Sequence, residues 1–391
     1  MLIGVVGKAN VGKSTFFKAC TLADVEIGNR PFVTIKPNRG TAYVKIDCVE
    51  KEFKVKCNPR EGYCLDGNRF VPIELLDVAG LIPGAHLGLG LGNTFLDDLN
   101  QADVLIHVID VSGSTNEKGD QVEALSYDPS NDIKFLEEEL DLWFLRLVKK
   151  GWDKFTRQIK QDNSEVYKAV AKQLSGLGVT EDISKEVLKN YNSDLTKWTE
   201  QELYNFARDL RKKTKPIIIA ANKLDVPGAD KNLERIKNEF KDYPIIGCSA
   251  EIELALREAA KKNLIKYIPG EDKFEIIGSL TEHQKKAMDF IKNFLEKFKD
   301  TGIQTVLNYS VFDLLDYIAV FPGGVNNLID SHGRILPDCF LLKKGSTALD
   351  FAFKIHTDIG NKFIRAIDVK KKLTVGKAHE LKHRDVIEII T

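Results

Sequence analysis

The chain alternates short, almost wholly apolar runs with longer stretches of helical periodicity. The apolar runs cover residues 2–7, 102–111, 215–221 and 244–248. Runs of this length and composition predict strands that are buried on both faces of a parallel sheet. Because helical stretches separate these runs, we expect right-handed βαβ crossovers and an α/β fold with a mainly parallel sheet.

Between residues 131 and 213 the pattern changes, and charged, leucine-rich segments with helical periodicity replace the strands. This change predicts a helical insertion into an α/β domain that is formed by residues 1–130 and 214–300. Over residues 306–391, short β-rich runs surround a few helical turns, which predicts a separate small α+β domain. The predicted helices of the insertion are residues 133–150, 163–174, 183–191 and 199–211.

The composition is that of a globular protein. The 391 residues are 43% hydrophobic and 29% charged, which excludes the disordered and collagenous classes. The 57 Lys and Arg balance the 57 Asp and Glu, so the formal net charge is zero. No apolar run approaches the roughly 18 residues that a membrane span needs. We therefore expect a cytoplasmic protein with no membrane partner that acts as a monomer.

The most specific motif follows the first apolar run, where a helix is expected to begin. It is a full GxxxxGK[ST] match made of Gly7, Lys8, Ala9, Asn10, Val11, Gly12, Lys13 and Ser14, with Thr15 next. Glycines allow backbone N–H groups to wrap around phosphate oxygens, and the N-terminus of the following helix adds positive charge. Lys13 would then reach the β and γ phosphates, and the Ser14 hydroxyl would bind Mg²⁺. A chance glycine turn is the alternative, which the strand–turn–helix context disfavours.

A DxxG motif, at Asp77 and Gly80, lies 64 residues beyond Lys13. Asp77 ends a predicted strand over residues 69–77, at the edge of the sheet that carries the phosphate-binding loop. P-loop NTPases hold their Mg²⁺-associated aspartate at this place, and the Gly80 N–H could contact the γ-phosphate. The motif is common on its own, and only its position after a phosphate-binding loop makes it informative.

Base recognition is predicted from an NKxD motif that follows the strand over residues 215–221. The Asp225 carboxylate can accept hydrogen bonds from N1–H and the exocyclic amine of guanine, donors that adenine does not present together. Asn222 can bond the base and the phosphate-binding loop, while the aliphatic stem of Lys223 covers the ring. After the next strand, backbone N–H groups of Ser249 and Ala250 would complete the base pocket. A surface turn in which Asp225 caps a helix is the alternative.

Together these segments resemble the Obg-related branch of the translation-factor-type GTPases, and in particular its YchF-like members. The resemblance rests on GKANVGKST (7–15), NRPFVTIKPNRG (29–40), DVAGLIPGAHLGLGLGNTFL (77–96), NKLD (222–225) and a C-terminal segment that is similar to a TGS domain, a β-grasp fold. It implies GTP and GDP as ligands, Mg²⁺ as cofactor, and residues 80–92 as a switch. Thr34 matches the threonine that contacts Mg²⁺ and the γ-phosphate, so the implied catalytic residues are Lys13, Thr34 and Gly80.

Three positions in these motifs affect the expected mechanism. Leu81 stands where a Ras-like hydrolase has a water-orienting glutamine, so we expect a low intrinsic rate of GTP hydrolysis that depends on another group. By resemblance Asn10 matches an asparagine that coordinates potassium, which makes K⁺ a candidate second ion; simple loop geometry is the alternative. His86 could approach the γ-phosphate, although a solvent-facing histidine is the favoured interpretation.

Specificity for guanine is predicted, with one alternative. Many YchF-like members have lost the NKxD motif and prefer ATP. The motif is intact here, as Asn222, Lys223 and Asp225, so an ATPase of the YchF type remains only the alternative.

The six cysteines are too sparse for a disulfide framework in a chain of this length. Cys48, Cys57 and Cys64 cluster within 17 residues, yet their spacings of nine and seven lack a CxxC pattern. Scattered buried or half-exposed thiols are therefore the favoured interpretation, with a zinc site as the alternative. His107, inside an apolar run, is predicted to be a core residue.

The C-terminal 52 residues contain eleven Lys and Arg against six Asp and Glu, whereas the first 339 residues carry a balance of −5. A basic patch of this kind, densest at residues 370–372, could contact RNA phosphates, and a solvated charged face is the alternative. With the TGS resemblance, it makes the ribosome or its RNA the expected partner. The sequence predicts a GTP-dependent switch, and a nucleotide-gated binding module with incidental hydrolysis is the alternative function.

Overall fold

The computed structural model describes residues 1–22, 39–78, 98–162, 164–330 and 332–391. Two compact units make up the chain. The first consists of Met1–Phe17 and Leu75–Glu251, and the second of Lys18–Glu74 and Ile252–Thr391. Among the described residues, no helix combines the length and the apolar character that crossing a membrane requires.

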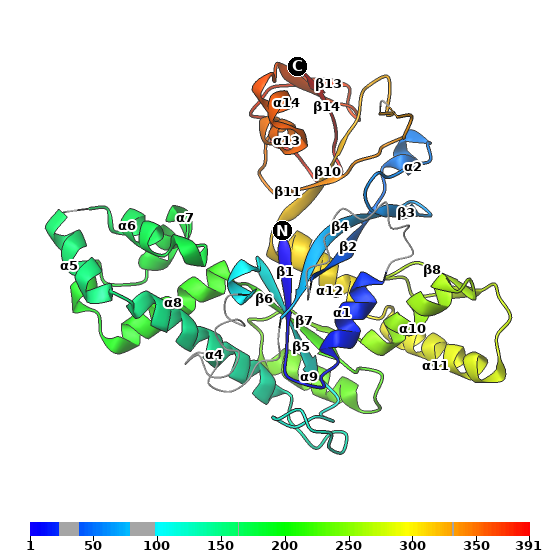
Figure 1. Ribbon diagram of the computed structural model, residues 1–391, viewed down its shortest axis with the longest axis horizontal. Coiled ribbons are helices and arrows are strands. Elements are labelled where there is room, and N and C mark those ends of the chain that lie inside the picture. Colours follow the sequence, from blue (N-terminus) through cyan, green and yellow to red (C-terminus); the bar gives the residue numbers. More distant parts are fainter. Residues whose placement is uncertain (23–38, 79–97, 163, 331) are drawn as a thin grey trace. The chain divides into compact units, whose positions relative to one another are not determined.

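The first unit contains a parallel sheet built from the predicted apolar runs (Figure 1). Its strands follow the order β4–β1–β5–β6–β7, and the pairs β1/β5, β5/β6 and β6/β7 are parallel. All residues of β1, β5 and β6 are buried, as expected for strands covered on both faces. The bounds are β1 Leu2–Val6, β4 Asn68–Asp77, β5 Val104–Asp110, β6 Ile217–Asn222 and β7 Ile245–Gly247.

Helices alternate with these strands. They are α1 Lys13–Thr21, α9 Ala229–Glu239 and α10 Ala250–Lys261, and α10 runs on into the second unit. The alternation of strand and helix, with parallel pairing throughout the core of the sheet, confirms the predicted α/β fold class.

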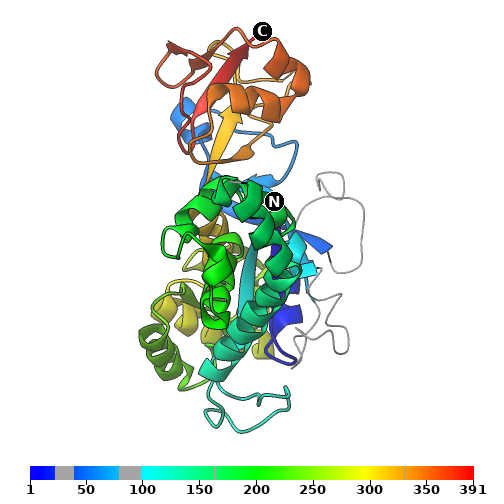
Figure 2. The same cartoon turned by 90° about the vertical axis from the view of Figure 1, so that its left-hand side faces the viewer.

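The segment between β5 and β6 is helical, and Figure 2 shows these helices, in green, lying side by side. The helices are α4 Ser130–Lys149, α5 Trp152–Asp162, α6 Val166–Gln173, α7 Glu181–Leu188 and α8 Glu200–Thr214, with 3₁₀ turns at Ser175–Leu177 and Leu195–Lys197. Four of them overlap the predicted helices. The fifth, α5, lies where no helix was predicted, and it buries Trp152, Thr156 and Ile159 on a mostly polar helix.

One apolar cluster joins these helices to the sheet. Trp152 packs against Trp198 and Phe206, with ring centroids 5.6 and 6.0 Å apart. The same cluster continues through helix α4 to Leu2 and Leu105 of the sheet. Since the helices share their core with β1 and β5, they extend the first unit and have no separate core.

The second unit begins with strands that pair outside the parallel core. Strand β3 runs antiparallel to β4, and Tyr63 stacks on Phe70 with ring centroids 4.5 Å apart. Strands β8 and β9 form a hairpin, and α12 leads into a π-helical turn at Ser310–Leu314. The bounds are β2 Arg39–Asp47, α2 Glu50–Phe53, β3 Tyr63–Leu65, β8 Ile265–Tyr267, β9 Phe274–Ile276, α11 Glu282–Phe298 and α12 Ile303–Tyr309.

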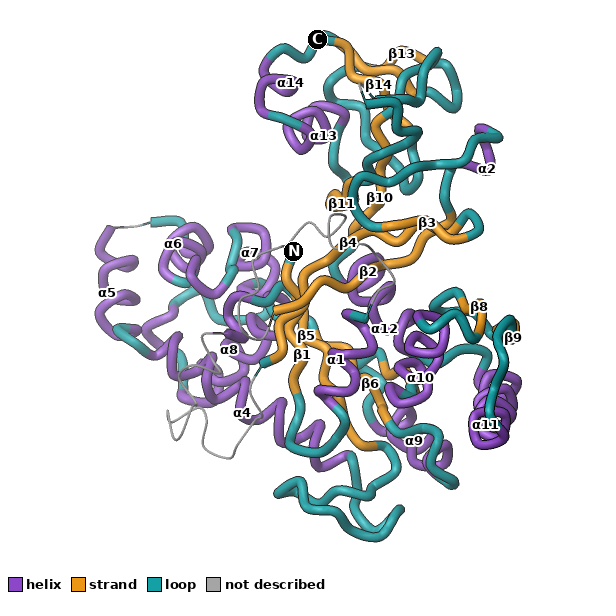
Figure 3. The backbone as a smooth tube through the Cα atoms, turned by 45° about the vertical axis from the view of Figure 1, so that its right-hand side comes forward, coloured by secondary structure: helices purple, strands orange, loops and turns teal. Residues whose placement is uncertain are grey.

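The C-terminal part of the second unit is a mixed sheet with two short helices, as the small α+β prediction requires (Figure 3). The strand order is β11–β10–β14–β12–β13, with β10 and β14 parallel in the centre. Phe351 of α13 packs on Val320 and Ile387 of the sheet. The bounds are β10 Tyr317–Pro322, β11 Phe340–Lys343, α13 Ala348–Ile355, α14 Thr357–Asn361, β12 Arg365–Asp368, β13 Leu373–Val375 and β14 Val386–Ile390.

A buried ion pair lies between helices α4 and α8. The guanidinium of Arg211, 1% exposed, donates to the Asp141 carboxylate at 2.8 Å, and Asp141 is 2% exposed. A buried charge without its partner costs far more than a surface pair contributes. All three tryptophans of the chain lie in these helices or in the segments that connect them, so tryptophan fluorescence reports on this part of the fold.

We expect Arg211→Ala to lower the free energy of unfolding by about 3–5 kcal/mol, because Asp141 is left charged and buried. The measurement is urea denaturation followed by tryptophan fluorescence. Lys213→Ala, which breaks the exposed pair with Glu186, is the control and should change stability by less than about 1 kcal/mol. Replacing both buried partners, as Arg211→Met with Asp141→Leu, should recover most of the loss. Equal effects of the two single variants would contradict this account.

Candidate nucleotide-binding site

The loop over residues 7–14 connects β1 to α1 and depends on two glycines. Gly7, at φ +155°, lies so close to the Val108 carbonyl that a Cβ atom would collide with it. A Cβ atom added to Gly12, which has φ +90°, would likewise collide with the side-chain amide of Asn222. Asn10 also adopts positive φ, at +62°. The tight wrap that phosphate binding requires is therefore present, and no L side chain could replace either glycine without strain.

Acidic side chains follow the strands on the same edge of the sheet. Asp77 ends β4 and Asp110 ends β5, and parallel strands place their carboxyl ends together beside the loop. The Lys13 ammonium forms an ion pair with the Asp77 carboxylate. The residue expected to serve the phosphates thus meets the residue expected to serve Mg²⁺. Ser14 is exposed in the first turn of α1, with Thr15 next to it.

Asn222 joins the loop to the segment after β7. Its Nδ2 donates to the Val11 carbonyl at 2.9 Å, which is the contact with the phosphate-binding loop that the NKxD motif predicts. Its Oδ1 accepts from the Ala250 N–H at 3.0 Å. This N–H was expected to face a base, and it instead fixes Asn222, which is 3% exposed. Ser249 beside it is fully buried.

Lys223 is held by a buried carboxylate that the sequence-based site did not include. At φ +65°, Lys223 places its Nζ 2.9 Å from Oδ2 of Asp110, which is 1% exposed. Burial alone would raise the pKa of Asp110, but hydrogen bonds from Ser112 and Lys223 outweigh it and hold that pKa below its ordinary value. The signal in the sequence that could have identified Asp110 is an aspartate near the end of an almost wholly apolar run.

Asp225 carries a buried oxygen that has no partner in the described part of the chain. Its Oδ1 is shielded from solvent, and no hydrogen-bond donor of the described residues reaches it. A buried carboxylate oxygen without a donor is costly, so a ligand that supplies an N–H group there gains affinity. This oxygen belongs to the carboxylate that the NKxD motif predicts to accept hydrogen bonds from guanine.

The Lys8 side chain is buried and paired within the first unit, so the phosphate contact predicted for Lys8 would come from its backbone N–H. Its ammonium is buried, 2.8 Å from Asp132 and 3.9 Å from the centre of the Tyr127 ring. Burial raises the pKa of Asp132. His107, 3% exposed, is the core residue that its apolar surroundings predict. Burial, together with the charge of Lys8, lowers the pKa of His107 to about 3 and keeps it neutral.

The remaining predicted positions either belong to the phosphate-binding loop or lie outside the described residues. Asn10 donates from Nδ2 to the Gly119 carbonyl at 2.9 Å, which fixes the orientation of its amide. Ala9 belongs to the same loop. Thr34, Gly80, Leu81 and His86 lie outside the described residues.

Cys48, Cys57 and Cys64 are buried or half-buried free thiols, as the favoured interpretation expects, but that interpretation is wrong in calling them scattered. The three converge, together with Glu50, in the second unit.

The carboxyl edge of the parallel sheet presents a phosphate-binding loop, a lysine–aspartate pair and an NKxD segment that is tied to the loop. These features define a P-loop nucleotide-binding protein of the GTPase class. Three family matches agree with this class. Residues 2–139 match the 50S ribosome-binding GTPase family, residues 220–325 the G4 motif-containing domain of Obg-like GTPases similar to YGR210, and residues 329–391 the TGS domain.

Whole-length relatives define the family more narrowly. A GTP-binding protein of Methanocaldococcus jannaschii is 52% identical, over 100% of this chain and 99% of its own. The structure of a GTP-binding protein from Pyrococcus horikoshii is 39% identical, with a TM-score of 0.79 and full coverage of both chains. The ribosome-binding ATPase YchF of Bacillus subtilis is 28% identical, over 93% of this chain and 87% of its own. The chain belongs to the Obg family of P-loop GTPases, in its YchF-like branch.

We expect Gly12→Ala to weaken binding of guanine nucleotides roughly tenfold or more, because the new Cβ displaces the Asn222 amide at a strained backbone position. Isothermal titration with GDP measures the effect. Gly176→Ala is the matched control in the same unit, since no atom lies within 4 Å of the added Cβ. Unchanged affinity in Gly12→Ala would show that the link between Asn222 and the loop is dispensable.

Proposed function

We propose that the protein binds GTP with Mg²⁺, hydrolyses it slowly, and works as a nucleotide-dependent switch. The observation that carries the proposal is the buried Oδ1 of Asp225, which has no donor in the described residues, on a segment that Asn222 ties to the phosphate-binding loop. A carboxylate held at that place has the chemistry to recognise guanine.

The described residues have the chemistry to hold Mg²⁺ and the phosphates. A hydroxyl, on Ser14, and a carboxylate, on Asp77, are the oxygen ligands that Mg²⁺ prefers. Ser14 and Asp77 would hold the ion, which would supply positive charge against the negative charge of the phosphates. Lys13 exchanges its ion pair with Asp77 for the phosphate oxygens. By resemblance, Thr34 and the Gly80 N–H contact the γ-phosphate, so that their segments report which nucleotide is bound.

We propose that the protein prefers GTP to ATP. The ATPase alternative is raised by the name of the Bacillus subtilis relative. The Asp225 carboxylate accepts hydrogen bonds, and guanine presents two donors, N1–H and the 2-amino group, to it. Adenine has an unprotonated N1, whose lone pair would face a carboxylate oxygen. Such an unpaired buried contact costs about 1–3 kcal/mol or more. The Lys223 stem, fixed by Asp110, is ready to cover the ring.

We expect Asp225→Asn to lower GTP affinity at least roughly 100-fold while raising affinity for xanthosine triphosphate, whose 2-oxo group accepts from the new amide. Competition titrations with GTP, ATP and xanthosine triphosphate measure this. Asp242→Asn, at a residue that is 84% exposed, is the control and should leave all three affinities unchanged. ATP binding as tightly as GTP to the unaltered protein would overturn the assignment.

Hydrolysis is proposed to need a group from outside the site. Leu81 cannot orient water, and burial keeps His107 neutral in the core. A potassium ion near Asn10, proposed by resemblance, would add positive charge at the phosphates. The other source is a partner, and relatives named as ribosome-binding make the ribosome the proposed one, for a protein acting as a monomer in the cytoplasm. A nucleotide-gated binding module with incidental hydrolysis is the competing function.

Contacts in the C-terminal sheet narrow the surface that an RNA partner could use. Lys370 and Arg384 both pair with Glu52, at 2.7 and 2.5 Å, and Lys371 pairs with Asp368 at 2.6 Å. These three side chains are therefore partly neutralised within the second unit. Exposed basic residues on the same sheet and its loops include Lys372, Lys377 and Lys382, which lie near the densest basic run, and the proposed RNA contact falls on them.

We expect single-turnover GTP hydrolysis to be slow in sodium buffer, faster in potassium buffer, and accelerated at least roughly tenfold by ribosomes, because each addition supplies the charge or group that Leu81 lacks. The measurement is phosphate release with each salt, with and without ribosomes. Asn10→Gly keeps the positive φ while removing the amide, so it should abolish only the difference between the two salts. Rates that are identical in all four conditions would favour the binding module.

A further inference from the structure

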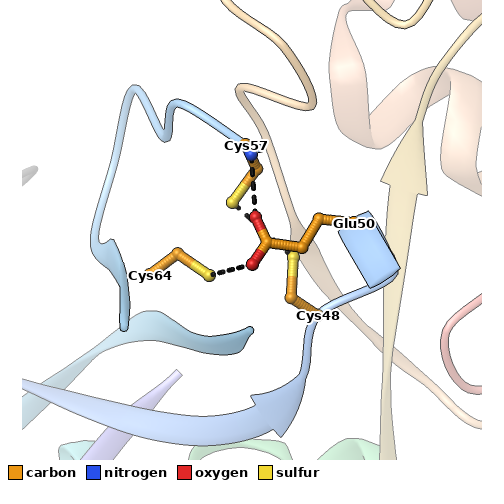
Figure 4. A group of neighbouring side chains, drawn as sticks. All are labelled: Cys48, Glu50, Cys57 and Cys64. Atoms are coloured by element: carbon orange, nitrogen blue, oxygen red, sulfur yellow. Dashed lines mark hydrogen bonds between the residues drawn. The ribbon is translucent and has the colours of Figure 1, made fainter. Parts of the chain in front are cut away.

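Three thiols and one carboxylate converge in the second unit, whereas the predicted nucleotide-binding residues that the structure describes belong to the first (Figure 4). The side chains are those of Cys48, Glu50, Cys57 and Cys64, and one potential ligand atom of each lies within 4.8 Å of all the others. Cys48 and Cys57 are buried, whereas Glu50 and Cys64 are half-buried. Among the described residues, no other group of three or more His, Cys, Asp or Glu side chains comes together in this way.

The distances between the potential ligand atoms suit tetrahedral coordination of one metal ion. The sulfurs of Cys48 and Cys57 are 3.6 Å apart, and the sulfur of Cys64 is 3.6 Å from Oε1 of Glu50. Zinc bonded to thiolates at about 2.3 Å in a tetrahedron separates its ligand atoms by about 3.8 Å. The four side chains therefore need only small shifts to surround one ion.

The ligands come from successive short elements and bracket a loop. Cys48 follows β2, Glu50 opens α2, and Cys64 lies in β3. Between α2 and β3, residues 54–62 form no helix or strand, and Cys57 is in this stretch. Within this stretch the Cys57 N–H donates to Oε2 of Glu50 at 2.8 Å, so the loop is already tied to the carboxylate of the cluster.

This loop bonds to the segment that leads into β11. The Asn58 N–H donates to the Ile335 carbonyl at 2.8 Å, and the Arg60 N–H donates to the Pro337 carbonyl at 2.9 Å. The Arg60 guanidinium also pairs with Asp338 at 3.0 Å. The conformation of the loop thus decides whether these bonds to the C-terminal part of the second unit can form.

We propose that Cys48, Glu50, Cys57 and Cys64 bind one structural zinc ion, which holds residues 54–62 in the conformation that bonds to residues 335–338. On binding, the thiols release their protons to solvent, and three sulfurs and one carboxylate oxygen become ligands of Zn²⁺. Thiolates select zinc over Mg²⁺ and Ca²⁺, which prefer oxygen ligands. No open coordination position is needed, as is usual for a structural site.

A disulfide between Cys48 and Cys57 is the competing account, and it explains less. It would use two of the thiols, and it would leave Cys64 and Glu50 joined only by the weak contact between the Cys64 thiol and Oε1 of Glu50. The sulfur–sulfur separation of 3.6 Å is also well beyond the roughly 2.05 Å of a disulfide bond.

The first test is metal content of the full-length protein, purified from zinc-supplemented medium without chelators or affinity metals. We expect about one zinc per chain by elemental mass spectrometry, and absorption typical of tetrahedral thiolate coordination after exchange into Co²⁺. The variant in which Cys48, Cys57 and Cys64 are all serine should lose the metal, while Cys339→Ala, the control, should retain it. Should the triple variant fail to fold, Glu50→Gln serves in its place and should release zinc to a chelator at least roughly tenfold faster.

The second test concerns the role of the ion. Removing zinc from the unaltered protein should speed amide hydrogen exchange at Asn58 and Arg60, with affinity for GDP unchanged, so failure here is distinct from failure of the proposed function. Any one of the following outcomes would overturn the proposal: metal content at background level, zinc retained in full by the triple serine variant, or two thiols missing from a titration of the denatured, unreduced protein. Iron and sulfide in place of zinc would overturn it as well.

Discussion

The nucleotide-binding site depends on the side-chain amide of Asn222, because that one group holds the base-recognition segment and the phosphate-binding loop at a fixed separation. Its nitrogen bonds the Val11 carbonyl, and its oxygen bonds the Ala250 N–H. Both bonds are buried, so losing either would leave a polar group unpaired at a cost of about 1–3 kcal/mol. The amide fits only because Gly12 lacks a Cβ atom. Sequence positions more than 200 residues apart are thereby constrained together.

The parallel sheet brings the charges of the site to one edge, and the charges then pair with one another. Lys13 meets Asp77, Lys223 meets Asp110, and Lys8 meets Asp132. These pairs differ in what they do. The Lys8 pair is buried and holds the loop to α4, whereas the Lys13 pair is half-buried and is the one that we propose a phosphate group replaces. Since Lys223 is already immobilised on Asp110, covering a base with its stem costs little additional side-chain entropy.

Sequence patterns predicted most of the first unit, because buried strands and a glycine loop leave local signals. The runs over residues 2–7 and 215–221 became β1 and β6. The sequence patterns did not predict contacts that depend on the direction in which a side chain points. Lys8 lies in the motif but points into the core, and α5 is polar except for a few residues that a neighbouring helix covers. Spacing along the chain likewise misjudged the cysteines, because a loop and a hairpin bring Cys57 and Cys64 back to Cys48.

In the C-terminal sheet, too, contacts between distant residues change what the sequence predicts, in this case the net charge of the surface. The segment from residue 340 onward has a surplus of five positive charges in the sequence, which makes it the expected RNA-binding part. Folding brings Glu52, more than 300 residues earlier in the chain, into ion pairs with both Lys370 and Arg384. The surplus of the segment is therefore not the charge of the surface, since an acidic residue from a distant element occupies part of it. Glu52 lies in α2, between Glu50 and the loop that contains Cys57. An ion that fixes this loop would also fix where the negative charge lies, and so which lysines remain available to a phosphate backbone.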